Sequence, residues 1–150
     1  MKLKSILLRK GFVIIKLKKL NTNHFEIKAT LNGVKGRFIL DTGASNSCLD
    51  ITLAEQFKLN VEDSETLAAG AGAIGMETKI SSNNTIKFKE WEYSNFNLVL
   101  LDLTHVNTAL TEHNAKAVEG IIGADILEKG KAIIDYKNKC VYLKKLVFKF

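Results

Sequence analysis

Alternation of apolar and polar residues is the feature that most restricts the fold of this chain. In the stretch HFEIKATLNG, every second residue is apolar: Phe25, Ile27, Ala29 and Leu31. This period of two is typical of a half-buried β-strand. The pair Asn32-Gly33 that follows is typical of a tight hairpin turn. Because the chain has ten glycines and no proline, we expect a β-rich fold whose turns are made by Gly and Asn.

Further segments of this type follow along the chain. Strands are predicted at 36–40 (GRFIL), 85–93 (TIKFKEWEY) and 96–103 (FNLVLLDL), with a hairpin formed by 131–136 and 140–148 around residues 137–139. The pattern predicts an all-β fold with a closed or sandwiched sheet.

Two short helices are predicted between these strands. Residues 51–60 (ITLAEQFKLN) indicate one helix, with Asp50 as N-cap and Leu53 and Phe57 on one face. VEGIIGADILEKG (118–130) indicates a buried strand, a glycine break and a helix that ends at Gly130. Residues 103–118 lack a clear period, and we expect a loop there with one helical turn.

Length and the absence of linkers or repeats predict a single domain over residues 1–150. The net charge of +6 is unevenly placed: residues 1–20 carry seven basic residues and no acid, whereas 21–128 carry eight basic and fifteen acidic residues. We expect residues 1–20 to form a basic N-terminal strand or extension. Because the body of the chain is acidic, a nucleic-acid partner is not expected.

No apolar run is long enough for a signal peptide or a membrane span, since Lys or Arg interrupts each one. Cys48 and Cys140 could form one disulfide, but they form no framework, and a reduced, cytoplasmic protein is expected. Cys48 lies in an apolar stretch and is expected to pack rather than react. His24, His105 and His113 lack metal-binding spacing, so neither a metal nor another cofactor is expected.

The segment FILDTGAS leads from an apolar strand directly into Asp41. A carboxylate at the end of a buried run is costly unless it is hydrogen-bonded. Gly43 allows a sharp turn and leaves room for a ligand to approach the backbone, and Thr42 adds a hydroxyl group. A strand-end turn is the plain interpretation of a single Asp, but these neighbours favour a functional one.

The motif ILDTGAS resembles the active-site motif of the single-domain retropepsin-like aspartic proteases. In that family a hairpin leads into Asp-Thr-Gly, and a glycine-rich flap and a hydrophobic-hydrophobic-Gly element with a short helix follow. The corresponding segments here are 24–45, 67–80, Ile121-Ile122-Gly123 and 125–129, so the resemblance covers about residues 22–147. It implies a retropepsin-like acid-protease fold and an aspartic endopeptidase.

The resemblance also implies a homodimer. Hydrolysis by carboxylates requires two of them, and no other aspartate in the chain is followed by Thr/Ser-Gly. A second copy must therefore supply the second Asp41 across a two-fold axis. The implied roles are Asp41 as the catalytic residue and Thr42, Gly43, Ala44 and Ser45 as the supporting loop, with Thr42 bonding its symmetry mate. The expected substrate is an extended peptide or protein.

The glycines of LAAGAGAIGM (67–76) match the Gly-x-Gly-x-x-Gly spacing of a dinucleotide-binding loop. That motif must follow a strand and open a helix, but the flanking segments are polar and contain Ser-Ser-Asn-Asn. A flap hairpin over the substrate is favoured over a plain glycine turn. Its substrate-binding residues would be Gly70, Ala71, Gly72, Ala73 and Gly75.

Two features leave a second interpretation open. Retroviral members often carry an Arg that helps to hold the dimer after the hydrophobic-hydrophobic-Gly element, whereas this chain has Ala124. The termini, with their apolar-basic alternation, could build part of a dimer sheet or cover the core. The alternative to a peptidase is a catalytically silent module of the same fold that binds peptides or proteins or dimerises.

Overall fold

The computed structural model describes residues 2–62 and 77–146. The helices are α1 (Leu3–Arg9), α3 (Thr104–Glu112) and α4 (Ala124–Lys129), with a 3-10 turn η1 (Ile51–Leu53). The strands are β1 (Phe12–Lys16), β2 (Lys18–Lys19), β3 (Phe25–Leu31), β4 (Val34–Leu40), β5 (Cys48–Asp50), β6 (Val61–Glu62), β7 (Thr78–Phe88), β8 (Trp91–Leu101), β9 (Gly120–Ile122), β10 (Ile133–Asp135) and β11 (Cys140–Lys144).

Most of these strands form one sheet that closes on itself. Within the described residues its order is β2-β3-β4-β9-β5-β8-β7-β6, and an additional pairing joins β3 to β7. The pairs Thr30–Lys87 and Leu31–Ile86 make this closure. A barrel results, with β2 and β6 attached outside the closed ring, as the all-β prediction requires.

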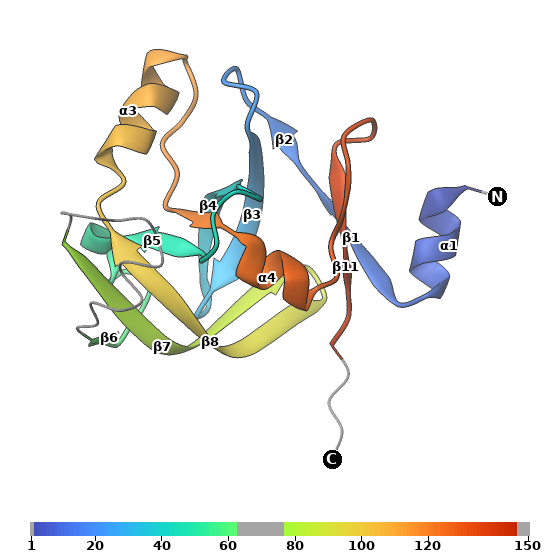
Figure 1. Ribbon diagram of the computed structural model, residues 1–150, viewed down its shortest axis with the longest axis horizontal. Helices are drawn as coiled ribbons and strands as arrows, with labels where there is room; N and C mark the ends of the chain where they lie inside the picture. The colour runs from blue at the N-terminus through green and yellow to red at the C-terminus, as the bar shows by residue number, and fades with distance from the viewer. Residues whose placement is uncertain (1, 63–76, 147–150) are drawn as a thin grey trace.

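The chain termini build a second sheet beside the barrel (Figure 1). In it β11 lies between β1 and β10 and pairs antiparallel with both. The predicted hairpin around 137–139 is therefore confirmed. The indole N–H of Trp91 donates to the carbonyl of Lys144 at 2.8 Å and ties β8 of the barrel to this sheet.

One apolar core joins the two sheets. Val13 of β1 and Val141 of β11 belong to the same buried cluster as Leu31, Phe38 and Trp91 of the barrel. Because the alternating side chains of each strand point into this cluster, the two sheets bury each other's apolar faces. The termini thus cover the core within one chain.

Two predicted strand boundaries near residue 90 were wrong. The segment predicted as one strand at 85–93 contains the turn between β7 and β8, and β8 runs without interruption into the segment predicted as a separate strand. The turn contains Lys89 at φ +53°, a left-handed conformation that lysine does not signal in a sequence. The break expected after Tyr93 is an irregularity inside β8, where Asn95 has φ +60°.

The helical content also differs from the prediction. Residues 3–9, expected to be strand or extension, form α1, which ends before Gly11 at φ +88° and buries Leu7 against β11. Residues 104–112 form α3 rather than a single turn. The helix expected at 51–60 is regular only over η1, although Asp50 does cap it by accepting from the Thr52 N–H at 3.0 Å.

The helix that ends at Gly130 is confirmed as α4. None of the helices in the two described ranges is long and apolar enough to cross a membrane.

Candidate active site

Asp41 lies where three strands meet. β9 runs parallel to β4 on one side and antiparallel to β5 on the other, so the loop from β4 to β5 must pass around its end. Asp41 is the first residue of that loop, and its backbone N–H donates to the carbonyl of Ile122 at 2.9 Å. The strand that leads into the acid is thereby fixed to the hydrophobic-hydrophobic-Gly element, 80 positions further on.

A backbone N–H of the same loop holds the Asp41 carboxylate in place. The Gly43 N–H donates to Asp41 Oδ1 at 2.9 Å, and the Ala44 N–H donates to the Asp41 carbonyl at 3.2 Å. A Cβ atom at position 43 would lie 3.2 Å from the same carboxylate oxygen, which is tighter than most contacts. Glycine at this position therefore lets the backbone approach the acid.

A buried hydroxyl group braces the far end of the loop. Ser47 is fully buried, and its Oγ donates to Asp125 Oδ1 at 2.7 Å and accepts from the Gly123 N–H at 2.8 Å. The Ser47 N–H donates to the same Asp125 oxygen at 3.0 Å. These three bonds connect the loop to the start of α4.

Close backbone contacts explain Gly120 in β9 and Gly123 directly after it. A Cβ atom at Gly123 would meet the carbonyl oxygen of Ala44 at 2.6 Å, and one at Gly120 would meet that of Cys48 at 2.3 Å. Neither position has room for a side chain, because the neighbouring loop and strand approach too closely. The Ala124 N–H uses this proximity to donate to the Ala44 carbonyl at 2.7 Å.

The remaining predicted loop residues face outward. Thr42, Gly43 and Ser45 are exposed, whereas Asp41 and Ala44 are half-buried. A hollow of about 400 Å³ beside Thr42 is lined mainly by apolar side chains of α4 and the segment after it, among them Leu127 and Ile134. An exposed threonine next to an apolar hollow leaves this side of the loop open to contact.

The structure thus brings Asp41, Gly43 and Ala44 together with Ile122 and Gly123. Ile122 is buried in the core and Ile121 is half-buried. The predicted flap residues Gly70, Ala71, Gly72, Ala73 and Gly75 lie outside the described residues. On either side of that segment β6 and β7 pair antiparallel, with Val61 opposite Ser81 and Glu62 opposite Ile80.

Cys48 lies beneath the loop and is not suited to nucleophilic chemistry. Burial raises the pKa of its thiol to about 12, so the thiol is neutral near pH 7. This confirms the prediction that Cys48 packs. It is a free cysteine, as is the buried Cys140. Within residues 2–62 and 77–146, no group of three or more His, Cys, Asp or Glu side chains could hold a metal ion.

Ser47 and Asp125 are the site residues that sequence reasoning missed. Serine and aspartate are ordinary turn and helix-start residues, and these two are separated by 78 positions. The available signal was positional, because Asp125 follows two residues after the glycine of the hydrophobic-hydrophobic-Gly element.

The chain resembles known proteins both in sequence and in structure. The model of the family described as aspartyl protease matches residues 27–126. No curated protein matches the chain. Many solved structures resemble it, and three of them illustrate the likeness. The first is a retropepsin-like aspartic protease from Rickettsia conorii, with 20% identity, 90% of each chain covered and a TM-score of 0.56.

The second is the retroviral protease-like domain of Ddi1 from Leishmania major, with 19% identity, 81% of this chain and 93% of that chain covered and a TM-score of 0.53. The third is the EIAV protease complexed with an inhibitor, with 21% identity, 82% of this chain and 91% of that chain covered and a TM-score of 0.52. At these identities the likeness shows the fold, which is retropepsin-like.

Proposed function

Because the chain belongs to the aspartyl protease family, we propose that it is an endopeptidase that works as a homodimer through two copies of Asp41. The observation that carries this proposal is the loop geometry. The Asp41 carboxylate accepts from the Gly43 N–H at 2.9 Å, at the point where β4 and β9 are joined. Asp50 and Asp102 accept a similar turn bond at the ends of β5 and β8, but the Asp41 loop is in addition bonded to Ile122 and Ala124, which lie about 80 positions further along the chain.

The proposed chemistry follows from the pairing of two like charges. Carboxylates about 3 Å apart cannot both be ionised, so the pair shares one proton. The ionised Asp41 takes a proton from a water molecule, which attacks the scissile carbonyl carbon. The protonated Asp41 donates to the carbonyl oxygen. Collapse of the tetrahedral intermediate breaks the C–N bond. The amine leaves with the proton that the first Asp41 took from water, and a hydroxyl proton of the intermediate returns to the second Asp41, so that the pair again shares one proton.

A second copy is needed because one chain carries one Asp-Thr-Gly. The exposure of Thr42 beside an apolar hollow supports a symmetric contact there, since an isologous interface brings the same residue from each copy together. In this dimer the two Thr42 hydroxyl groups bond each other and hold the two loops in register.

The proposed substrate is an extended segment of a peptide or protein. The hairpin predicted at residues 67–80 would cover it, with backbone amides of the glycine-rich tip pairing with the substrate backbone. This assignment stays a prediction.

Peptide cleavage by wild type and by Asp41→Asn tests the proposal. Both are assayed on a mixed peptide library between about pH 4 and 7, where carboxylates titrate. We expect cleavage by wild type and only background cleavage by the variant. Asp102→Asn is the matched control, because asparagine can replace aspartate as the acceptor of the Thr104 N–H before α3. Equal background cleavage by wild type and Asp41→Asn would refute the peptidase and favour the catalytically silent module.

Sedimentation of the same samples tests the dimer. We expect a dimer at the concentrations at which cleavage is observed. Cleavage by a strict monomer would contradict the pairing of two Asp41 carboxylates.

A further inference from the structure

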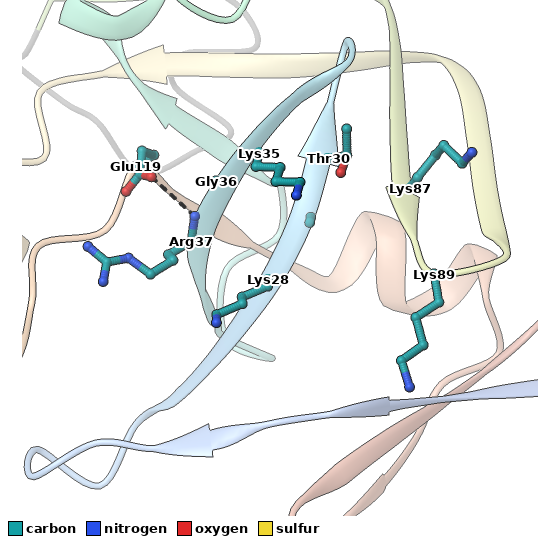
Figure 2. A pocket seen from close by; sticks show the side chains of 9 residues that line it. Lys28, Thr30, Lys35, Gly36, Arg37, Lys87, Lys89 and Glu119 are labelled. Carbon is teal, nitrogen blue, oxygen red and sulfur yellow. Dashed lines mark hydrogen bonds between the residues drawn. The ribbon is translucent and has the colours of Figure 1, made fainter.

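Two adjoining hollows lie on the outer face of the hairpin formed by β3 and β4. They have volumes of about 490 and 430 Å³, and both are lined by Lys28, Arg37 and Lys89. In Figure 2, Lys28 and Lys89 extend from β3 and from the β7–β8 turn on either side of the first hollow. Neither hollow is lined by a residue of the loop that starts at Asp41.

The charge around the hollows is strongly positive. The first hollow adds Lys35 and Lys87 to the shared residues, and the second adds Lys16, Lys18 and Lys116. All seven lysines of the two hollows are exposed. In the described part of the chain, no acidic side chain forms an ion pair with any of them.

The two acids at this surface are already engaged by Arg37. Glu26 is buried, and its carboxylate lies 3.9 Å from Arg37 Nε, while Glu119 accepts from the Arg37 backbone N–H at 3.2 Å. The guanidinium also donates to the carbonyl of Ala117 at 3.0 Å. Arg37 therefore offsets one of the two acids, and the seven lysines leave this surface with a strong positive excess. Like charges within a Debye length of about 8–10 Å repel, which an anionic occupant would relieve.

The edge of β3 is open between the two hollows. On this side Glu26 pairs with Lys18 of β2 and Thr30 pairs with Lys87 of β7. Lys28 between them pairs with Arg37 of β4 on the opposite side, and no described strand pairs with it on this side. The carbonyl of His24 and the N–H of Asn32 also bond on this side. Because backbone groups alternate along a strand, the N–H and C=O of Lys28 face the gap.

We propose that this lysine gap, formed by Lys16, Lys18, Lys28, Lys87, Lys89 and Lys116, binds an extended acidic segment of a polypeptide. The open strand edge offers backbone bonds to a peptide, and the lysines pair with its carboxylates. A single-stranded nucleic acid fits less well, because no aromatic ring lines either hollow for base stacking and the guanidinium of Arg37 is engaged.

This binding does not depend on the proposed function. Arg37 precedes Asp41 by four residues, or roughly 13 Å along an extended strand, and its side chain points to the outer face. An acidic segment can therefore bind whether or not Asp41 is catalytic. Using Asp41→Asn as the background separates the two proposals, since a failure of binding there says nothing about cleavage.

The first test measures binding of a fluorescent peptide of ten glutamates to full-length Asp41→Asn at about 0.15 M salt. We expect saturable binding that is weakened about tenfold or more by Lys28→Glu with Lys89→Glu. The matched control is Lys58→Glu with Lys145→Glu. It changes the net charge equally, and Lys58 shares the left-handed conformation of Lys89, with φ +56° against +53°. Absence of binding, or equal weakening by both double variants, would overturn the proposal.

Two further measurements locate the bound peptide and compare it with a nucleic acid. The first does not rely on a variant that could misfold. Amide chemical shifts of ¹⁵N-labelled Asp41→Asn should change on peptide addition at residues 16–18, 26–30 and 87–89. Shifts confined to residues 41–47 would place the peptide in the catalytic loop and refute the inference. A ten-nucleotide poly-dT strand should bind more weakly than the peptide, and tighter binding of the strand would also refute it.

Discussion

Replacing Ser47 with alanine removes two of the three bonds that brace the Asp41 loop against the start of α4. The hydroxyl group bonds a carboxylate oxygen at 2.7 Å and the Gly123 N–H at 2.8 Å, and the residue is fully buried. In Ser47→Ala the carboxylate of Asp125 still accepts a hydrogen bond from the backbone N–H of residue 47, which is 3.0 Å long in the wild type. The Gly123 N–H, by contrast, loses its acceptor in a place that water does not reach.

The magnitude follows from these two losses. A hydrogen bond to a charged group contributes about 1.5–3 kcal/mol, and an unsatisfied buried N–H costs about 1–3 kcal/mol. Because one donor to Asp125 remains, we expect a loss of about 3 kcal/mol in the free energy of unfolding. With a urea m-value of about 2 kcal/mol/M, the midpoint should fall by about 1.5 M. The melting temperature should fall by roughly 6–12 °C.

Ser45→Ala is the matched control, because it makes the same chemical change two residues earlier on an exposed side chain. We expect it to change the free energy of unfolding by less than about 0.5 kcal/mol. Urea unfolding followed by circular dichroism measures both variants. If the two midpoints shift equally, the Ser47 bonds do not brace the loop and the reasoning fails.

Two other predictions concern the surroundings of the loop. Gly120→Ala should destabilise the protein by about 1–3 kcal/mol, and more than Gly36→Ala. The Cβ at position 120 would lie 2.3 Å from a backbone carbonyl of β5, whereas that at position 36 would lie 3.1 Å from the rings of Phe38 and Phe57. Equal losses in urea unfolding would contradict this. Because burial raises the pKa of Cys48 to about 12, its thiol is neutral at pH 8, and iodoacetamide should alkylate it only after unfolding. Rapid alkylation of the folded protein, located by mass spectrometry, would show that the thiol is accessible.

The sequence predicts those turns whose residue types, such as Asn and Gly, favour the backbone conformation that the turn requires. Asn32 and Gly33 have φ values of +50° and +84°, so the turn of the first barrel hairpin is visible from its residue types. Lys89 adopts φ +53° in the β7–β8 turn, but lysine is no marker of that conformation. The helix α1 had a marker in Gly11, yet the basic-apolar pattern before it does not distinguish a short helix from a strand.

Long-range contacts could not be predicted from the sequence. The resemblance placed the Asp41 loop and Ile121-Ile122-Gly123 in one family pattern, but only the structure shows that they touch, with a Cβ at Gly123 meeting the Ala44 carbonyl oxygen at 2.6 Å. The barrel closes through two residue pairs between β3 and β7 together with the bonds between Asn32 and Thr85. No local pattern identifies these pairs, since each strand alone shows only that one of its faces is buried.

Ala124 bears on how each copy of the proposed dimer would hold its Asp41 loop. With no long cationic side chain here, position 124 contributes its N–H, which bonds the Ala44 carbonyl at 2.7 Å, and the next residue, Asp125, holds Ser47. Each copy therefore braces its own Asp41 loop with bonds inside one chain. It follows that dimerisation would supply the second carboxylate and the Thr42 contact, while the geometry of each loop would not depend on it.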